Sequence, residues 1–104
     1  MNKVELRTFL EQYSISNGWD KEDSTIVEIL RNAKSLKEFG REEHRWYTLF
    51  NRVVQIGDIF IQFKNVDWSG DEPPMSNEEV NSIILNSLIQ VAPKEVMITD
   101  YIAI

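Results

Sequence analysis

The stretch WYTLFNRVVQIGDIFIQFK, residues 46–64, decides the fold of this chain. It is rich in β-branched and aromatic residues, which favour strands, and the pair Gly57-Asp58 lies within it. A two-residue connection with glycine first is typical of a type II′ turn between antiparallel strands. The stretch therefore predicts a β-hairpin in which Val54 lies opposite Ile61.

The two faces of this predicted hairpin differ in character. Every second side chain along a strand points to the same face. One face is apolar and is expected to meet the core: Trp46, Phe50, Val54, Ile56, Ile59, Ile61 and Phe63. The other face is mixed: Tyr47, Leu49, Asn51, Val53, Gln55, Phe60, Gln62 and Lys64. We expect the mixed face to be half covered or to meet a partner.

Two helices are predicted before the hairpin. Asn2 is a suitable cap for a helix that runs to about Tyr13, because apolar residues follow at helical spacing. The pair Asn17-Gly18 is turn chemistry and interrupts this pattern. A second helix follows, and its apolar stripe continues through Leu36 and Phe39 to Gly40, a natural helix stop. Trp19 is expected in the core, like Trp46.

The remainder of the chain predicts a short helix and a final hairpin. Ser76 and Glu79 form a capping-box pattern, which marks a helix start, although residues 80–92 fit helix or strand. Residues 88–92 and 95–104 read as two strands around Pro93-Lys94. The expected fold is α+β: two N-terminal helices packed on an antiparallel sheet of about four strands. Residues 1–104 form a single domain, with a helical part at 1–40 and a β-rich part at 46–104.

Composition limits the classes of function. The chain has 104 residues and no cysteine, which removes disulfides and thiolate chemistry. No apolar run approaches the roughly 20 residues that span a bilayer, and the charged N-terminus does not resemble a signal peptide. We therefore expect a cytoplasmic protein without membrane contact.

The net charge of −6 is unevenly distributed along the chain. Residues 46–104 hold three Lys/Arg and eight Asp/Glu, and so carry −5 of it. Phosphate binding requires Lys and Arg to displace counterions, so we expect no direct nucleic-acid binding. The same charge attracts basic protein surfaces, although simple solubility is a sufficient reason for it.

The acidic stretch NVDWSGDEPPMSNEEV, residues 65–80, has a partial calcium-loop pattern. Oxygen donors fall at alternate positions from Asn65 to Asp71, with Gly70 at the sixth position. The twelfth position is Ser76, where the loop requires a bidentate glutamate. We therefore expect no metal and no cofactor.

The single histidine, His44, is the best candidate for acid–base chemistry. The neighbouring Glu43 is positioned in sequence to orient its ring. No serine or cysteine nucleophile stands in a recognisable motif, and the four glycines are isolated turn residues. The sequence therefore favours a protein that is not an enzyme, with no catalytic residues.

Trp68 is unusual because it is a large apolar residue among acids. It either folds back on the sheet or is an exposed anchor for a protein partner. A partner surface at this place has six candidate residues: Asp67, Trp68, Asp71, Glu72, Glu78 and Glu79. The acids would steer association with a basic protein surface.

From Trp46 onward the chain resembles small acidic proteins encoded by phages and prophages. The matching pieces are the aromatic strand start, the Gly57-Asp58 hairpin, the Ser69-Gly70-Asp71 loop and the closing segment at 91–96. This resemblance implies an accessory factor that binds a host protein, such as an anti-CRISPR or another anti-defence inhibitor. Such proteins commonly place acidic surfaces in nucleic-acid channels.

The leading hypothesis is thus a small, acidic, non-enzymatic protein-binding module, an inhibitor that binds a basic and nucleic-acid-binding surface of a host protein. The alternative is a structural or assembly protein that self-associates through a sheet edge. The apolar segment VMITDYIAI, residues 96–104, would supply that edge. A homo-oligomer is compatible with either hypothesis.

Overall fold

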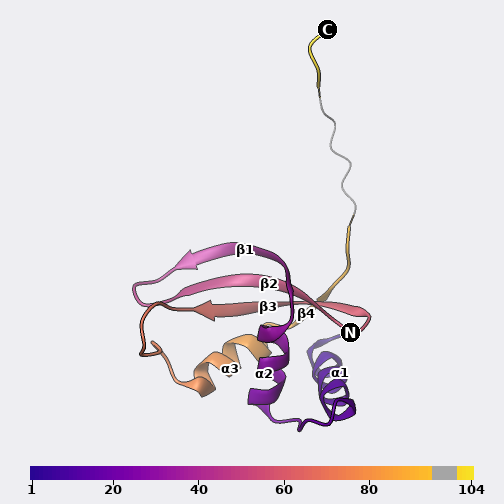
Figure 1. Ribbon diagram of the computed structural model, residues 1–104, viewed down its shortest axis with the longest axis vertical. Coiled ribbons are helices and arrows are strands. Elements are labelled where there is room, and N and C mark those ends of the chain that lie inside the picture. The colour runs from indigo at the N-terminus through magenta and orange to yellow at the C-terminus, as the bar shows by residue number, and fades with distance from the viewer. Residues whose placement is uncertain (95–100) are drawn as a thin grey trace.

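The computed structural model describes residues 1–94 and 101–104 and has an α+β architecture (Figure 1). In chain order the elements are α1 (Lys3–Ser16), α2 (Asp23–Asn32), β1 (Ser35–Glu43), β2 (Thr48–Ile56), β3 (Ile59–Asp67), α3 (Asn77–Asn86) and β4 (Ile89–Val91). The predicted fold class is confirmed. Two helices precede a four-stranded antiparallel sheet, and a short helix precedes the last strand.

The strands lie in the order β1-β2-β3-β4, and the β2–β3 hairpin has the predicted register. Val54 pairs with Ile61, and Ile56 pairs with Ile59 across the turn. Gly57 has a φ of 59°, which glycine adopts without strain. The predicted core face is confirmed at five positions, which are all buried: Phe50, Val54, Ile56, Ile61 and Phe63.

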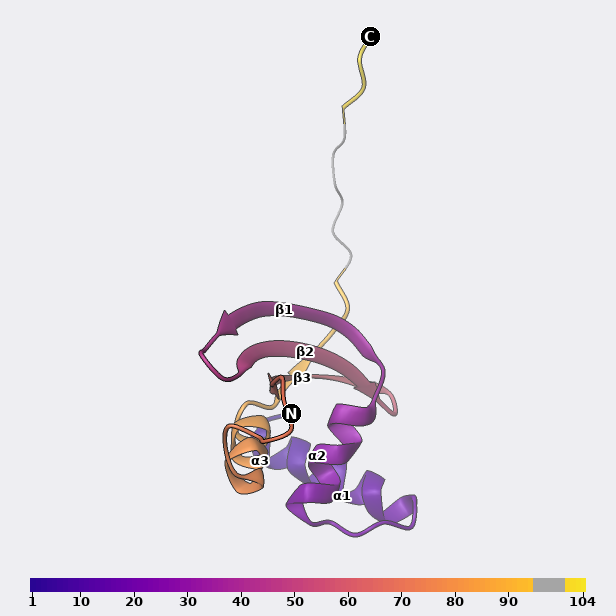
Figure 2. The same cartoon turned by 60° about the vertical axis from the view of Figure 1, so that its left-hand side comes forward.

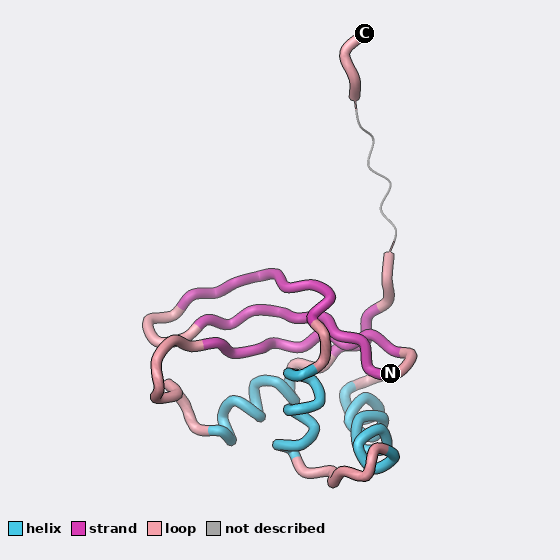
Figure 3. Tube along the Cα trace, viewed as in Figure 1, coloured by secondary structure: helices cyan, strands magenta, loops and turns pink. Residues whose placement is uncertain are grey.

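The three helices gather beside β3 and β4, and β1 is the strand farthest from them (Figures 1 and 2). α3 packs on β3, α2 packs on α3, and α1 contacts α2 and β4. The core fills the space between them: Leu6, Leu10, Ile26, Val27, Leu30, Val54, Ile56, Ile61, Phe63, Val66, Val80, Ile84 and Leu88. Every residue of β1 is exposed, so this strand extends beyond the layer that the helices cover (Figure 3).

The second helix is shorter than the sequence predicts. α2 ends at Asn32, and Ala33 already has extended backbone angles, φ −65° and ψ 149°. Leu36 and Phe39, which fit a helical stripe, lie instead in β1 and are 48% and 37% exposed. β1 pairs with β2, whose backbone groups would otherwise form an unpaired sheet edge. The helical part therefore ends at residue 32 and not at 40.

The final hairpin is confirmed only in its first strand. β4 pairs with Phe60–Gln62 of β3, and the ambiguous segment 80–92 divides into α3 and β4. Of the predicted partner strand, residues 95–100 lie outside the described residues, and 101–104 have no regular secondary structure. Within residues 1–94 and 101–104, no helix has the length and apolar character that a bilayer crossing requires.

Candidate functional site

Two connections meet at one end of the sheet, opposite the Gly57-Asp58 turn (Figure 1). They are the β1–β2 connection, residues 44–47, and the β3–α3 connection, residues 68–76. They meet because Thr48 pairs with Glu43 on one side and with Asp67 on the other. A pocket of about 240 Å³ lies between them, lined by His44, Arg45, Trp46, Tyr47, Thr48, Asp67, Trp68 and Ser69.

Trp46 is exposed at this end of the sheet, so the prediction that it lies in the core is wrong. Its side chain is 66% exposed, and the Arg45 guanidinium lies 4.8 Å from its ring centre. Trp46 precedes β2 and lies in a bend, so strand alternation does not govern its direction. Trp19 is also misassigned, since it is 51% exposed after α1. The charged residues that precede Trp46 in the sequence were the signal that could have indicated its exposure.

His44 stabilises the β1–β2 connection through three contacts. Its Nε2 lies 2.9 Å from Glu42 Oε1, and its ring stacks on Tyr47 with ring centres 4.6 Å apart. The His44 backbone N–H also donates to the Tyr47 carbonyl at 2.8 Å. The carboxylate beside the ring is thus Glu42, whereas the sequence pointed to Glu43. These contacts fix the shape of the turn that presents Trp46.

Trp68 folds back toward the sheet, which is one of the two placements that the sequence allowed. It is half-buried and packs against the core. The Arg31 guanidinium of α2 lies 5.7 Å from its ring centre, a favourable cation–π arrangement. Arg31 Nη2 also donates to the Val66 carbonyl at 3.3 Å. The contact with Arg31, which sequence reasoning missed, ties the beginning of the β3–α3 connection to α2.

The remaining predicted acids extend from this end of the sheet to the start of α3. Asp67, Asp71 and Glu72 are exposed along the connection. Glu78 and Glu79 are exposed in the first turn of α3, where the helix dipole favours carboxylates. The six predicted residues therefore do not converge on one point. The five acids are exposed along residues 67–79, and we call them the acidic strip; Trp68, half-buried, lies between the first two of them.

Glu78 also belongs to an acidic groove of about 660 Å³ between the helices. We call it the acidic groove; it is lined by Arg7, Glu22, Asp23, Ser24, Glu78, Asn81, Ser82, Leu85 and Asn86. Glu22 and Asp23 begin α2, and Glu78 begins α3, so two helix N-termini supply its carboxylates. Sequence reasoning missed Glu22 and Asp23 because only the packing of α2 on α3 brings them to Glu78.

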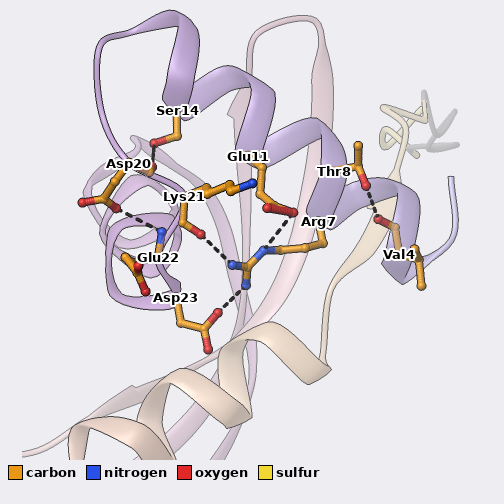
Figure 4. A network of polar contacts seen from close by, with 9 residues as sticks. All are labelled: Val4, Arg7, Thr8, Glu11, Ser14, Asp20, Lys21, Glu22 and Asp23. Carbon is orange, nitrogen blue, oxygen red and sulfur yellow. Dashed lines mark hydrogen bonds and ion pairs between the residues drawn. The ribbon is translucent and has the colours of Figure 1, made fainter.

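Arg7 is the one cationic side chain among the residues that line the acidic groove, and it is already paired (Figure 4). Its Nη1 lies 2.6 Å from Asp23 Oδ1, and its Nε lies 3.6 Å from Glu11 Oε1. Its Nη2 donates to the Lys21 carbonyl at 2.9 Å. The groove therefore keeps a negative balance, because Glu22 and Glu78 have no ion-pair partner among the residues that the structure describes.

Asp20 adds negative charge just before α2. Its Oδ1 accepts a hydrogen bond from the Thr25 hydroxyl. It also accepts one from the Glu22 backbone N–H at 3.0 Å, which Figure 4 shows. These two hydrogen bonds, first that from Thr25 and then that from Glu22, lower the pKa of Asp20 below its usual value of 3.8. Asp20 is thus held in its charged form over a wider range of pH.

The described part of the chain holds no group of three or more His, Cys, Asp or Glu side chains placed to bind a metal ion. Comparison of the chain with models of protein families, with curated proteins and with solved structures finds no match. The surface itself, with its acidic strip and acidic groove, therefore provides the arguments about function.

Proposed function

We propose that this protein is a small non-enzymatic module that binds a basic surface of another protein. The observation that carries the proposal is the acidic groove, whose carboxylates come from the N-termini of both α2 and α3 and whose single arginine is internally paired. The exposed acids Asp71 and Glu72 continue this charge along the β3–α3 connection. Lysine and arginine side chains are the chemistry that such a surface attracts.

Each part of the surface has a distinct task in this proposal. The acids at 67, 71, 72, 78 and 79 steer the partner and set its register. Trp68 holds the connection against the body of the protein through Arg31, so less conformational entropy is lost on docking. Trp46, exposed at the adjoining end of the sheet, offers a large apolar contact of the kind that dominates interface energetics.

The specific form that we propose is an inhibitor of a nucleic-acid-binding protein. Carboxylates that follow an exposed strip can occupy the positions of phosphate groups in a basic channel. The resemblance of residues 46–104 to small acidic phage-encoded accessory proteins supports this form. Inhibition of a host defence protein is the corresponding biological setting.

A capture experiment with charge reversals inside and outside the acidic groove tests the proposal. The wild-type protein, immobilised, is expected to retain a basic protein from a bacterial lysate. The double variant Glu22→Lys/Glu78→Lys reverses two charges in the acidic groove. It is expected to bind at least about tenfold more weakly, a loss of ~1.4 kcal/mol in binding free energy. Asp58→Lys reverses one exposed charge at the opposite end of the sheet and should bind like the wild type.

Salt provides the second measurement. The affinity for the captured protein should fall as ionic strength rises, because exposed charges are screened over about 10 Å at 0.1 M salt. An affinity that is indifferent to salt would contradict the electrostatic proposal. Equal binding by the groove variant and by Asp58→Lys would contradict the location of the site.

Self-association is a second candidate function, and one observation favours it. The face of the sheet away from the helices has a pocket of about 480 Å³ with apolar residues from all four strands: Leu36, Phe39, Val53, Phe60 and Val91 are among its lining. In the described residues the two edge strands of the sheet are β1 and the short β4, and the register shifts and charges of β1 oppose edge pairing. Solution mass measured over a range of concentrations distinguishes a stable oligomer from a monomer.

A further inference from the structure

A second pocket, of about 500 Å³, lies between α2 and the helix-facing side of β1 and β2. It exists because the helices pack on β3 and β4 and leave the inner face of β1 uncovered. We call it the arginine pocket; it is lined by Glu28, Arg31, Asn32, Glu38, Arg41, Phe50, Arg52, Asn65, Val66 and Asp67. It is separate from the acidic groove, with which it shares no residue.

Three guanidinium groups line the arginine pocket, and two of them keep most of their donors available. A guanidinium carries five N–H donors. Arg52 is the most engaged of the three, since its Nε and Nη2 lie 3.1 Å and 2.9 Å from Glu38 Oε2 and its Nη1 donates to the Arg31 carbonyl at 3.3 Å. Arg31 donates one hydrogen bond, to the Val66 carbonyl. Arg41 lies 3.9 Å from Glu38 Oε1 and 5.1 Å from the ring centre of Phe50.

Asn65 supplies a further hydrogen-bond donor at the same place. The residue is only 3% exposed and lines the arginine pocket. Its Oδ1 accepts the Val66 backbone N–H at 3.0 Å. Within residues 1–94 and 101–104 no group accepts a hydrogen bond from its Nδ2. No buried side-chain nitrogen or oxygen of the described residues lacks a hydrogen-bond partner, so Asn65 Nδ2 is open to solvent and can be reached by an acceptor in the pocket.

The formal charges that line the arginine pocket balance, with three arginines and three carboxylates. Of its three carboxylates, Glu38 is neutralised by Arg52 and Arg41. Glu28 and Asp67 are exposed, where water and salt weaken their fields. Among the described residues, Arg31 and the Asn65 amide have no carboxylate partner, and Arg41 has only the 3.9 Å contact with Glu38. Planar guanidinium forks match the geometry of carboxylate and phosphate groups.

We propose that the arginine pocket binds the oxyanionic group, a phosphate or a carboxylate, of a small molecule. Arg31 and Arg41 provide the charge and Asn65 Nδ2 provides a neutral hydrogen bond. Glu38 and Arg52 hold the wall of the pocket in place through their ion pair. This site shares no residue with the acidic groove, although Asp67 belongs both to the pocket and to the proposed protein-binding surface, and it goes beyond the function proposed for that surface.

An NMR titration of the full chain tests the proposal. Inorganic phosphate and succinate are added separately, with sodium chloride at matched ionic strength as the reference. We expect saturable shifts of the Asn65 side-chain amide and of the Nε–H signals of Arg31 and Arg41. Saturation by phosphate alone identifies a phosphoryl ligand, and saturation by succinate alone identifies a carboxylate ligand. Saturation by both supports the shared oxyanion chemistry.

Two variants and one control locate the binding. Asn65→Asp keeps an oxygen to accept the Val66 N–H but removes the free donor and adds negative charge. Arg41→Gln removes a guanidinium whose side chain is 56% exposed, so the fold should tolerate it. Each is expected to weaken binding about tenfold or more, for loss of a charged or buried hydrogen bond. Lys21→Gln removes one positive charge before the other end of α2 and should bind like the wild type.

Two outcomes would overturn the proposal. The first is that phosphate and succinate cause only the linear shifts that sodium chloride causes. The second is that Arg41→Gln and Lys21→Gln bind equally well, which would assign the effect to overall charge. If Asn65→Asp does not fold, the comparison of Arg41→Gln with Lys21→Gln decides alone. None of these outcomes depends on whether the acidic groove binds a protein.

Discussion

Gly40 lies in the middle of β1 with a φ of 68°, between the residues at which the β1–β2 register shifts. A side chain at this position would be unfavourable for two reasons. The backbone angle is one that L-residues with a Cβ rarely adopt, and a Cβ would lie 2.8 Å from Asn51 Nδ2. The irregularity of β1 is therefore encoded by a glycine that also resembles a helix stop.

Gly40→Ala should lower the free energy of unfolding by about 2 kcal/mol, since the αL conformation costs roughly 1–2 kcal/mol and the contact with Asn51 adds to it. Gly18→Ala is the matched control. Gly18 has a φ of 80°, but nothing lies within 4 Å of its added Cβ. Gly18→Ala should therefore lower the free energy of unfolding by only about 1 kcal/mol. Urea denaturation of both variants measures the difference, and equal losses would show that the Asn51 contact has no energetic weight.

At the scale of the element, α3 shows how a local signal places functional residues. Ser76 caps the helix, because its Oγ accepts the Glu79 backbone N–H at 3.1 Å. This cap fixes the first turn, and the first turn carries Glu78 into the acidic groove. The pattern Ser76 to Glu79 was readable from the sequence because capping depends only on neighbouring residues.

Ser76→Ala should destabilise the protein by about 1 kcal/mol, the usual cost of a lost N-cap hydrogen bond. Ser24→Ala is the control, because Ser24 is exposed in the first turn of α2 and is not its N-cap residue. Circular dichroism during thermal unfolding measures both. A midpoint for Ser76→Ala that matches the control would contradict the role of the cap.

The limits of prediction from sequence follow the range of the interactions. The β2–β3 hairpin and the start of α3 rest on local chemistry and were predicted correctly. Leu36 and Phe39 fit a helix by spacing, but the edge of β2, distant in sequence, draws them into β1. In the candidate site, Asp71 and Glu72 are recognisable from composition. The grouping of Glu22 with Glu78 requires the packing of α2 on α3, which a single sequence does not reveal.

At the scale of the whole molecule, stability depends on one core between the helices and the inner strands. Phe63 and Phe60 belong to the same strand, β3, but differ in surroundings. Phe63 is fully buried on the side of the helices, whereas Phe60 is half-buried and lines the pocket on the opposite face. This pair isolates the contribution of the core from that of the open face.

Phe63→Ala should destabilise the protein by about 3–5 kcal/mol, because it removes a buried ring and leaves a cavity. Small domains have a free energy of unfolding of about 5–15 kcal/mol, so this variant is expected to be partly unfolded at 37 °C. Phe60→Ala should have a clearly smaller effect. Guanidinium denaturation measures both, and similar losses would mean that the open face contributes to stability as the core does.

The isolation of β1 has a consequence for local unfolding. None of the residues of the core cluster lies in this strand, so β1 can detach while the core remains intact. Because α2 precedes it and β2 follows it, β1 would detach as a tethered loop and not as a frayed end. Such an opening exposes the backbone donors and acceptors of β2 to any strand nearby. Strand exchange at β2 is thus accessible without global unfolding, and the strength of the β1–β2 ladder governs how often it begins.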